Sequence, residues 1–364
     1  MRRPSPSGLW RNPAFVRVWT AATISIFGSL ITRMALPLVA ILVLGSGALE
    51  VALLRGLELG AALLFGLVAG AWVDRLRRRP VLIWADLGRA VLLGSVPVAF
   101  VVGGLSYGQL LLGSIRQREA APPPPETRDP VLREIRAGID LVWRDPILRA
   151  FAGAQMCLAA LWGVFGATWF LFVLDDLGLG PAVMGLVAGV GGASSFIGAI
   201  AAGRATRRWG VGRVAIGAMI LAAVGNAFVP LAPAGLPLLA IVCLVLQQLV
   251  ADSAVTVYDI TEVSVRQSFV HDRALGRVAS TFKVAAMLAQ LLATLGAGVI
   301  AEAVGVRATA WIAPLGGLVA AAVLWASPVR RLVDLPAAAA LGRPPAPDPL
   351  AIAVAIEMEQ PPGA

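Results

Sequence analysis

The residues from Gly70 to Arg79 read GAWVDRLRRR, and Pro80 follows them. Asp74 and four arginines place five charges in six positions, and long apolar runs lie on both sides. Apolar runs cannot hydrate these charges, so we interpret the stretch as a short loop at a membrane surface between two spanning helices. Loops rich in arginine favour the cytoplasmic side of a membrane. The stretch therefore sets the orientation that we expect for every other helix.

The composition indicates an all-α integral membrane protein rather than a soluble enzyme. Hydrophobic residues make up 58% of the 364-residue chain and the mean hydropathy is +0.82, which is too apolar for a soluble domain. The formal net charge of +9 comes from arginines in short clusters between apolar runs, so we expect no nucleic-acid partner. His271 is the only histidine and both cysteines lie in apolar runs, so we expect no catalytic residue, no metal and no cofactor.

Nine stretches reach the roughly 20 residues that a helix needs to cross a bilayer, so we predict about nine spans. They are Val16–Leu44, Val51–Trp72, Val81–Leu105, Leu148–Val173, Ala182–Gly203, Val211–Leu231, Leu236–Asp259, Ala279–Ile300 and Ala308–Ala326.

Loops rich in arginine alternate with loops that have few, and this sets the domain organisation. The arginine-rich loops contain Arg207, Arg208, Arg266 and Arg277, whereas the arginine-poor loops contain Asp176 and Glu302. The positive-inside bias places the first kind and both termini in the cytoplasm. We expect a shortened N-terminal half with three spans at 1–115, a cytoplasmic linker at 116–147, a six-helix half at 148–330 and a disordered cytoplasmic tail at 331–364.

The linker contains a predicted amphipathic helix at Val131–Trp143, where apolar residues recur at helical spacing. Such a helix lies on a membrane surface or against a loop. A cytoplasmic linker conflicts with three preceding spans, because three crossings from a cytoplasmic N-terminus end outside. Either Ser106–Ile115 makes a short or re-entrant crossing, the boundaries within 81–115 shift, or part of an ancestral chain is missing.

Two basic loops share one pattern. The motif Gly70-x3-Asp74-Arg75-x3-Arg79 recurs among the later spans as Gly203-x3-Arg207-Arg208-x4-Arg213. With this repeat the chain resembles the major facilitator superfamily, in which two related halves form a transporter. The stretch Ser264–Ser280, with Arg266 and Arg277, and the opening Leu9–Phe15 are similar to bacterial exporters of the enterobactin-exporter type.

The resemblance implies twelve helices in two halves, so this chain would lack most of helices four to six. It implies proton-coupled export of hydrophobic small molecules, of drug or siderophore type, by alternating access in the cytoplasmic (inner) membrane. It also implies that Gly70, Asp74, Arg75 and Arg79 form a cytoplasmic gate loop facing the start of the eleventh helix near Ala279–Ser280. We expect a monomer whose partners are its substrate, protons and the lipid bilayer. The alternative is a truncated membrane protein that does not transport, or a regulatory remnant.

Charged side chains inside predicted spans need a reason, because each costs about 2.5–3.5 kcal/mol on insertion scales. Arg55 and Glu58 are three residues apart and either face a proton or substrate site or form a local ion pair. Arg33 either faces a cavity or pairs with Glu58. Asp252 lies deep in its span, where a carboxylate that faces a cavity can take up and release protons. We therefore name Arg33, Glu58 and Asp252 as the candidate proton or substrate site.

Overall fold

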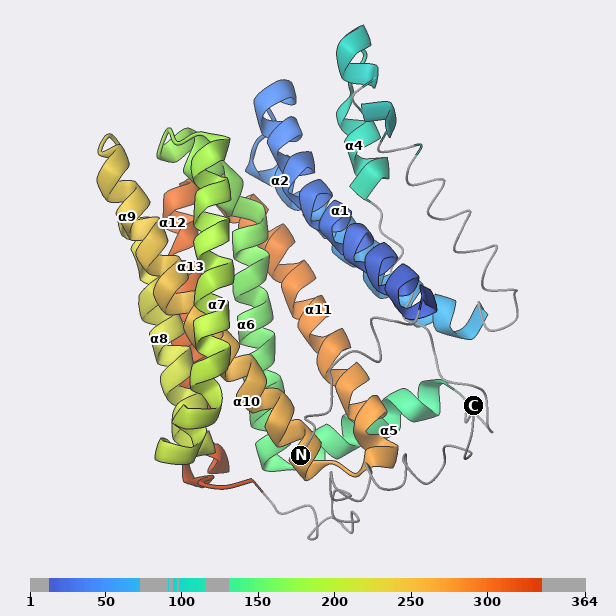
Figure 1. The fold of residues 1–364 in the computed structure, drawn as a ribbon, viewed down its shortest axis with the longest axis vertical. Helices are drawn as coiled ribbons and strands as arrows, with labels where there is room; N and C mark the ends of the chain where they lie inside the picture. The colour runs from blue at the N-terminus through green and yellow to red at the C-terminus, as the bar shows by residue number, and fades with distance from the viewer. Residues whose placement is uncertain (1–12, 73–90, 92–93, 97, 115–130, 336–364) are drawn as a thin grey trace, which may run out of the picture. The chain divides into compact units, whose positions relative to one another are not determined.

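The computed structural model describes residues 13–72, 91, 94–96, 98–114 and 131–335, and helices with short turns make up this part of the chain (Figure 1). The chain divides into two compact units. Unit 1 comprises Met1–Ala121, Gly166–Asp176 and Thr294–Thr309, and unit 2 comprises Pro122–Phe165, Leu177–Ala293 and Ala310–Ala364. The long helices α6 and α11 each contribute residues to both units.

Unit 1 is built on the α1–α2 hairpin. Its helices are α1 (Pro13–Leu44), α2 (Ala48–Trp72), α4 (Tyr107–Ser114), the ends of α6 and α11, the π-helix Phe172–Asp176 and most of α12 (Val306–Ala310). Gly45 ends α1 with a φ of +64°, which only glycine adopts at little cost, and its N–H bonds to Ile41 O. A small apolar core of Leu36, Ala40, Leu54 and Leu110 then holds α1, α2 and α4 together.

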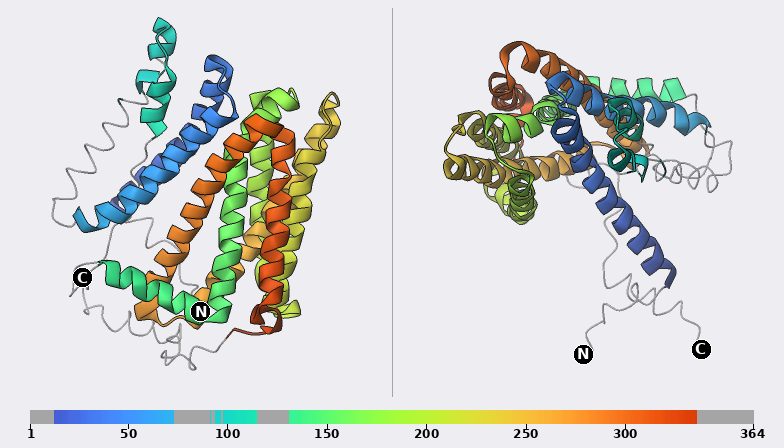
Figure 2. Two further views of the ribbon diagram at one scale, coloured as in Figure 1. Left: turned by 180° about the vertical axis from the view of Figure 1, so that it is seen from behind. Right: turned by 90° about the horizontal axis from the view of Figure 1, so that it is seen from above.

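Unit 2 is a bundle of long apolar helices. These helices are α5 (Val131–Arg144), α6 (Pro146–Leu171), α7 (Pro181–Trp209), α8 (Val211–Leu231), α9 (Pro237–Gln247), the π-helix Gln248–Asp252, α10 (Ser253–Phe269), α11 (Asp272–Val304) and α13 (Ile312–Ala326), with a final 3-10 turn at Pro328–Arg331. The sequence predicts an amphipathic helix where α5 lies. The α13 helix packs along α8, as the view from behind shows (Figure 2).

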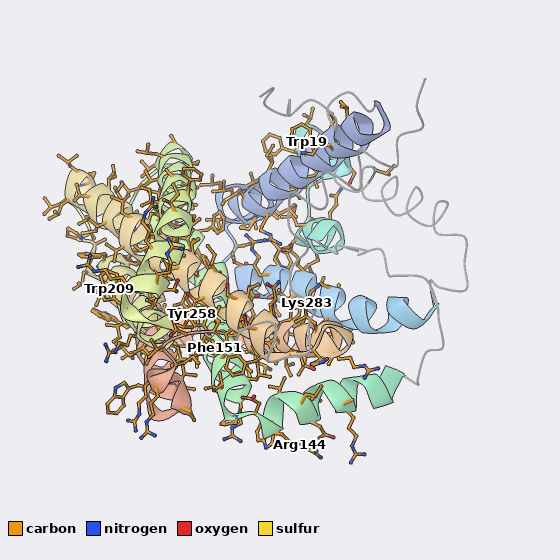
Figure 3. All side chains as sticks on the ribbon, turned by 60° about the horizontal axis from the view of Figure 1, so that its bottom comes forward. Trp19, Arg144, Phe151, Trp209, Tyr258 and Lys283 are labelled. Carbon is orange, nitrogen blue, oxygen red and sulfur yellow. The ribbon has the colours of Figure 1, made fainter. Side chains whose placement is uncertain are left out.

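Glycines allow the unit 2 helices to approach closely. A Cβ atom at Gly225 of α8 would lie 2.6 Å from Ala251 N, and one at Gly317 of α13 would lie 2.9 Å from Ala223 Cβ. Small residues at such crossings are how apolar helices pack in the absence of a hydrophobic driving force between them. Deeper in the bundle, the rings of Phe151 and Tyr258 stack at 6.1 Å, and the Tyr258 hydroxyl donates to Phe151 O at 3.3 Å (Figure 3).

Six helical segments of the described residues are long and apolar enough to cross a membrane. They are Pro146–Asp176, Pro181–Trp209, Val211–Leu231, Pro237–Phe269, Ala274–Val304 and Val306–Ala326. These six correspond to the six spans that the sequence predicts for the later half. The α1 and α2 helices cover two of the other three predicted spans without being among the six, and the total of about nine stays a prediction.

Several predicted features fall outside the described residues. Gly70 is near the C-terminal end of α2, but Asp74, Arg75 and Arg79 of the predicted gate loop lie beyond it. Most of the span Val81–Leu105 and of the tail 331–364 lies outside as well. The gate loop and the loss of helices four to six therefore stay predictions.

Candidate functional site

The first candidate site is an arginine cluster in unit 1, formed by Arg33 of α1 with Arg55 and Glu58 of α2. Arg55 Nη1 donates to Glu58 Oε2 at 3.1 Å, and Arg55 Nη2 donates to Arg33 O at 2.6 Å. Arg33 Nη2 lies 3.5 Å from Glu58 Oε1. Glu58 therefore contacts both arginines that the sequence suggests as its partners, Arg55 at 3.1 Å and Arg33 at 3.5 Å.

The two guanidinium groups have different surroundings. The Arg55 side chain is only 14% exposed, and its Cζ lies 5.8 Å from the centre of the Phe170 ring at the end of α6. The Arg33 side chain is 50% exposed. Because a charge facing lipid is costly, we expect the exposed side of this arginine to face water. The cluster therefore contains one buried guanidinium group, that of Arg55, and one half-exposed guanidinium group, that of Arg33.

The second candidate site surrounds Asp252 in unit 2, where the helix between α9 and α10 widens into a π-helix at Gln248–Asp252. Ser194 Oγ of α7 donates to Gln248 O at 2.8 Å, and Ser253 Oγ donates to Ser194 O at 2.9 Å. Gln248 Nε2 donates to Val187 O at 3.2 Å. These bonds hold the π-helix against α7; π-helical turns are frequent at functional sites.

The Asp252 carboxylate packs against Gly191 of α7. Gly191 of α7 leaves the space that it fills, since a Cβ atom there would lie 2.6 Å from Asp252 Oδ2. No hydrogen bond or ion pair joins this carboxylate to another residue within the described part of the chain. The site thus presents one ionisable group among neutral hydrogen-bonding ones, which we call the Asp252 cluster: Gly191, Ser194, Gln248, Asp252 and Ser253.

A buried ion pair lies further along α10. Glu262 is 5% exposed, and its Oε1 lies 3.6 Å from Arg266 Nε. Arg266 Cζ is 5.3 Å from the centre of the Phe282 ring of α11. The sequence predicts Arg266 on a basic loop, whereas the structure places it within α10, which ends at Phe269. Of the other predicted loop arginines, Arg207 and Arg208 lie in the last turn of α7 and Arg277 is exposed in α11.

Two carboxylates that the sequence predicts on loops, Glu302 and Asp176, make polar contacts at helix ends. Glu302, in the last turn of α11, accepts a hydrogen bond from Leu49 N at 3.1 Å and so caps α2. The N-cap residue is Gly47, which has no side chain to make that bond, and a Cβ atom on it would lie 2.7 Å from Glu302 Oε1. Glu50 Oε2 completes the cap by accepting from Gly47 N at 2.9 Å.

A second such contact joins the ends of α6 and α12. Arg307 donates through Nε and Nη2 to Asp176 Oδ2 at 3.0 and 2.7 Å, and its Cζ lies 5.2 Å from the Phe172 ring centre. Neither Glu302 nor Asp176 could be assigned a partner from the sequence. The only local signal was Gly47-x2-Glu50, which marks the start of a helix but not the helix that completes its cap.

Six apolar helical segments of spanning length, one of which carries Asp252 in its interior, are typical of a multi-pass membrane protein. Among the described residues, no group of three or more histidine, cysteine or acidic side chains could hold a metal ion. The family model described as Major Facilitator Superfamily matches residues 151–356, which is more than half of the chain. The chain therefore belongs to the major facilitator superfamily, whose members are transporters.

Two solved structures share the fold. A crystal structure of a bacterial homologue of the iron transporter ferroportin in an inward-facing state is 15% identical, with a TM-score of 0.61 over 84% of this chain and 97% of that one. The same kind of homologue in an outward-facing state is 14% identical, with a TM-score of 0.50 over 82% of this chain and 97% of that one. A search of curated proteins found no match.

Proposed function

We propose that this chain is a proton-coupled exporter of hydrophobic small molecules, of drug or siderophore type, that works by alternating access. Membership of the family supports transport, and the two similar structures were captured in inward-facing and outward-facing states. We further propose that the arginine-rich helix ends face the cytoplasm, in line with the positive-inside bias.

The observation that carries the proton coupling is the Asp252 carboxylate, which has no ion-pair partner among the described residues and lies within an apolar span. A carboxylate in that position is tolerated when it is protonated, or when it is ionised and hydrated. A proton carrier needs a group that passes between these two forms. The π-helix supports this role because it sets Asp252 apart from the regular packing of α9 and α10.

The test is transport by the purified full-length chain in liposomes with an imposed pH gradient. A panel of lipophilic cations, neutral drugs and siderophores is loaded, and gradient-dependent flux of at least one compound is expected. Flux that ignores the gradient would remove the proton coupling. If none of the compounds moves under any gradient, the alternative of a membrane protein that does not transport replaces the exporter.

The gate loop has a separate test. In the role that we propose, Asp74 stabilises the closed cytoplasmic side by its interaction with the start of α11, because a carboxylate is favoured at a helix N-terminus. Asp74→Asn should then lower the transport rate while leaving the amount of folded protein unchanged. Unchanged transport by an otherwise active Asp74→Asn variant would rule out the gate.

A further inference from the structure

The arginine cluster holds two guanidinium groups and one carboxylate among its three members. Glu58 makes its short contact with Arg55, at 3.1 Å. Its contact with Arg33, at 3.5 Å, is longer than the 2.7–3.2 Å of a good N–H···O hydrogen bond. Arg33 is thus loosely held as well as half-exposed, and within the described residues its only polar side-chain contact is the one with Glu58, which leaves most of its five N–H donors for another partner.

Arg55 adds a donor beside it. Both of its terminal nitrogens are used, by Glu58 and by Arg33 O, but Arg55 Nε is buried and makes no hydrogen bond to any residue that the structure describes. A buried donor without an acceptor costs about 1–3 kcal/mol. A group that accepts hydrogen bonds and carries negative charge would satisfy this donor and the open face of Arg33 together.

The surroundings indicate what else such a ligand carries. The cluster lies on two apolar helices, and the apolar neighbours of Arg33 and Glu58 in the sequence, Met34 and Leu57, are exposed. An inorganic anion gains nothing from an apolar surface, whereas an organic acid can bury its hydrocarbon part there. The planar fork of arginine matches the two oxygens of a carboxylate, and also pairs with other acid groups.

We propose that the arginine cluster binds the acidic group of the transported molecule, so that the substrates are lipophilic organic anions rather than lipophilic cations. This inference rests on the proposed transport function and narrows its substrate class. Arg33 supplies the open charge, Arg55 supplies the buried donor, and Glu58 keeps Arg55 in place.

The experiment uses three probes that share one naphthalene ring: the 2-sulfonate, the 2-sulfonamide and the 2-trimethylammonium salt. The sulfonate stays ionised at every pH used, so its passive leak is slow. The full-length chain in liposomes under a pH gradient should move the sulfonate at least about tenfold faster than the trimethylammonium probe, the ratio that about 1.4 kcal/mol of selective binding gives. Thermal unfolding in detergent provides a second readout, since the sulfonate should raise the Tm.

Variants identify the site. Arg33→Gln should abolish both the preference for the sulfonate and its effect on Tm, and Arg33→Lys should keep part of each because it keeps the charge without the fork. Arg331→Gln, which removes an exposed arginine from the final 3-10 turn, is the matched control and should behave like the parent chain.

The possible outcomes distinguish failure of the anion site from failure of the proposed exporter function. Faster flux of the trimethylammonium or sulfonamide probe, after the leak in protein-free liposomes is subtracted, would overturn the anion site and leave the exporter standing. A sulfonate preference that survives Arg33→Gln would overturn the assignment to this cluster. Stabilisation by chloride but not by the sulfonate would show an inorganic anion site instead. If no probe moves and none shifts the Tm, the anion site fails, and the panel of lipophilic cations, neutral drugs and siderophores decides separately whether the chain is an exporter.

Discussion

The arginine cluster and the Asp252 cluster both place polar groups within apolar helices, but different interactions hold them. In the arginine cluster, charges contact one another: Arg55 and Glu58 are 3.1 Å apart, and Arg33 remains half-exposed beside them. In the Asp252 cluster, serine hydroxyls and a carboxamide bond to backbone carbonyls, and the one ionisable group fits against Gly191.

This difference matters for function because a cluster of paired charges and a single packed carboxylate respond differently when a charge is added or removed. A cluster with two cations and one anion can accept a further anion, and it becomes unstable when its own anion is removed. A single carboxylate among neutral partners can change its protonation state without leaving another charge unpaired. The first arrangement suits recognition of a charged solute, and the second suits exchange of a proton.

The largest expected effect is on the arginine cluster. Glu58→Gln leaves two guanidinium groups without a carboxylate among the three residues, and the loss should be about 3 kcal/mol of unfolding free energy, as for other broken buried pairs. Thermal unfolding in detergent measures it. The double variant Arg55→Gln/Glu58→Gln should recover much of the loss because the buried cation goes too. Equal stability of Glu58→Gln and the parent chain would show that charge pairing does not hold this cluster.

The next prediction compares two glycines of α7 near the Asp252 cluster, one that contacts a backbone carbonyl and one that contacts side chains. A Cβ atom at Gly198 would overlap the Ser253 carbonyl, so Gly198→Ala must push α10 away from α7 and should cost about 2 kcal/mol. A Cβ atom at Gly191 meets only the ends of the Gln248 and Asp252 side chains, so Gly191→Ala should cost less and act mainly on proton coupling. Gly189, with open space around it, is the control. The same loss of stability at all three positions would contradict this assignment of contacts.

The smallest effect concerns the helix cap in unit 1. Glu302→Ala removes the acceptor for Leu49 N and should lower the free energy of unfolding by about 1 kcal/mol, the usual value of a helix N-cap. Glu302→Gln keeps an acceptor oxygen and should stay close to the parent chain. If the two variants unfold at the same temperature, the hydrogen bond to Leu49 contributes nothing measurable.

The spanning helices could be predicted from the sequence because hydropathy is a local property. The predicted span Val211–Leu231 has the bounds of α8, and the other five spans of the later half overlap the remaining helical segments of spanning length. The helix that contains most of the predicted span Leu236–Asp259 continues beyond Asp259. Glu262 and Arg266 pair with each other in this continuation, which includes buried Val265 and ends at Phe269.

The contacts between distant residues could not be predicted in this way. Glu302 caps a helix that begins 254 residues earlier in the sequence, counting from Ala48 to Glu302, and no local pattern encodes that partner. The π-helix at Gln248–Asp252 likewise depends on bonds to α7 from a segment that reads as an uninterrupted apolar run. Sequence patterns did identify Arg33, Glu58 and Asp252 as residues that need an explanation, because charges in spans are costly.

The most direct test of proton coupling compares the parent chain with Asp252→Asn in liposomes. The variant keeps the shape of the side chain and removes only its ability to ionise. We expect the parent chain to accumulate its substrate against a concentration gradient when a pH gradient is imposed. Asp252→Asn should lose this accumulation yet still exchange substrate down its own gradient. Accumulation by Asp252→Asn at the rate of the parent chain would contradict the role of Asp252 as the proton carrier.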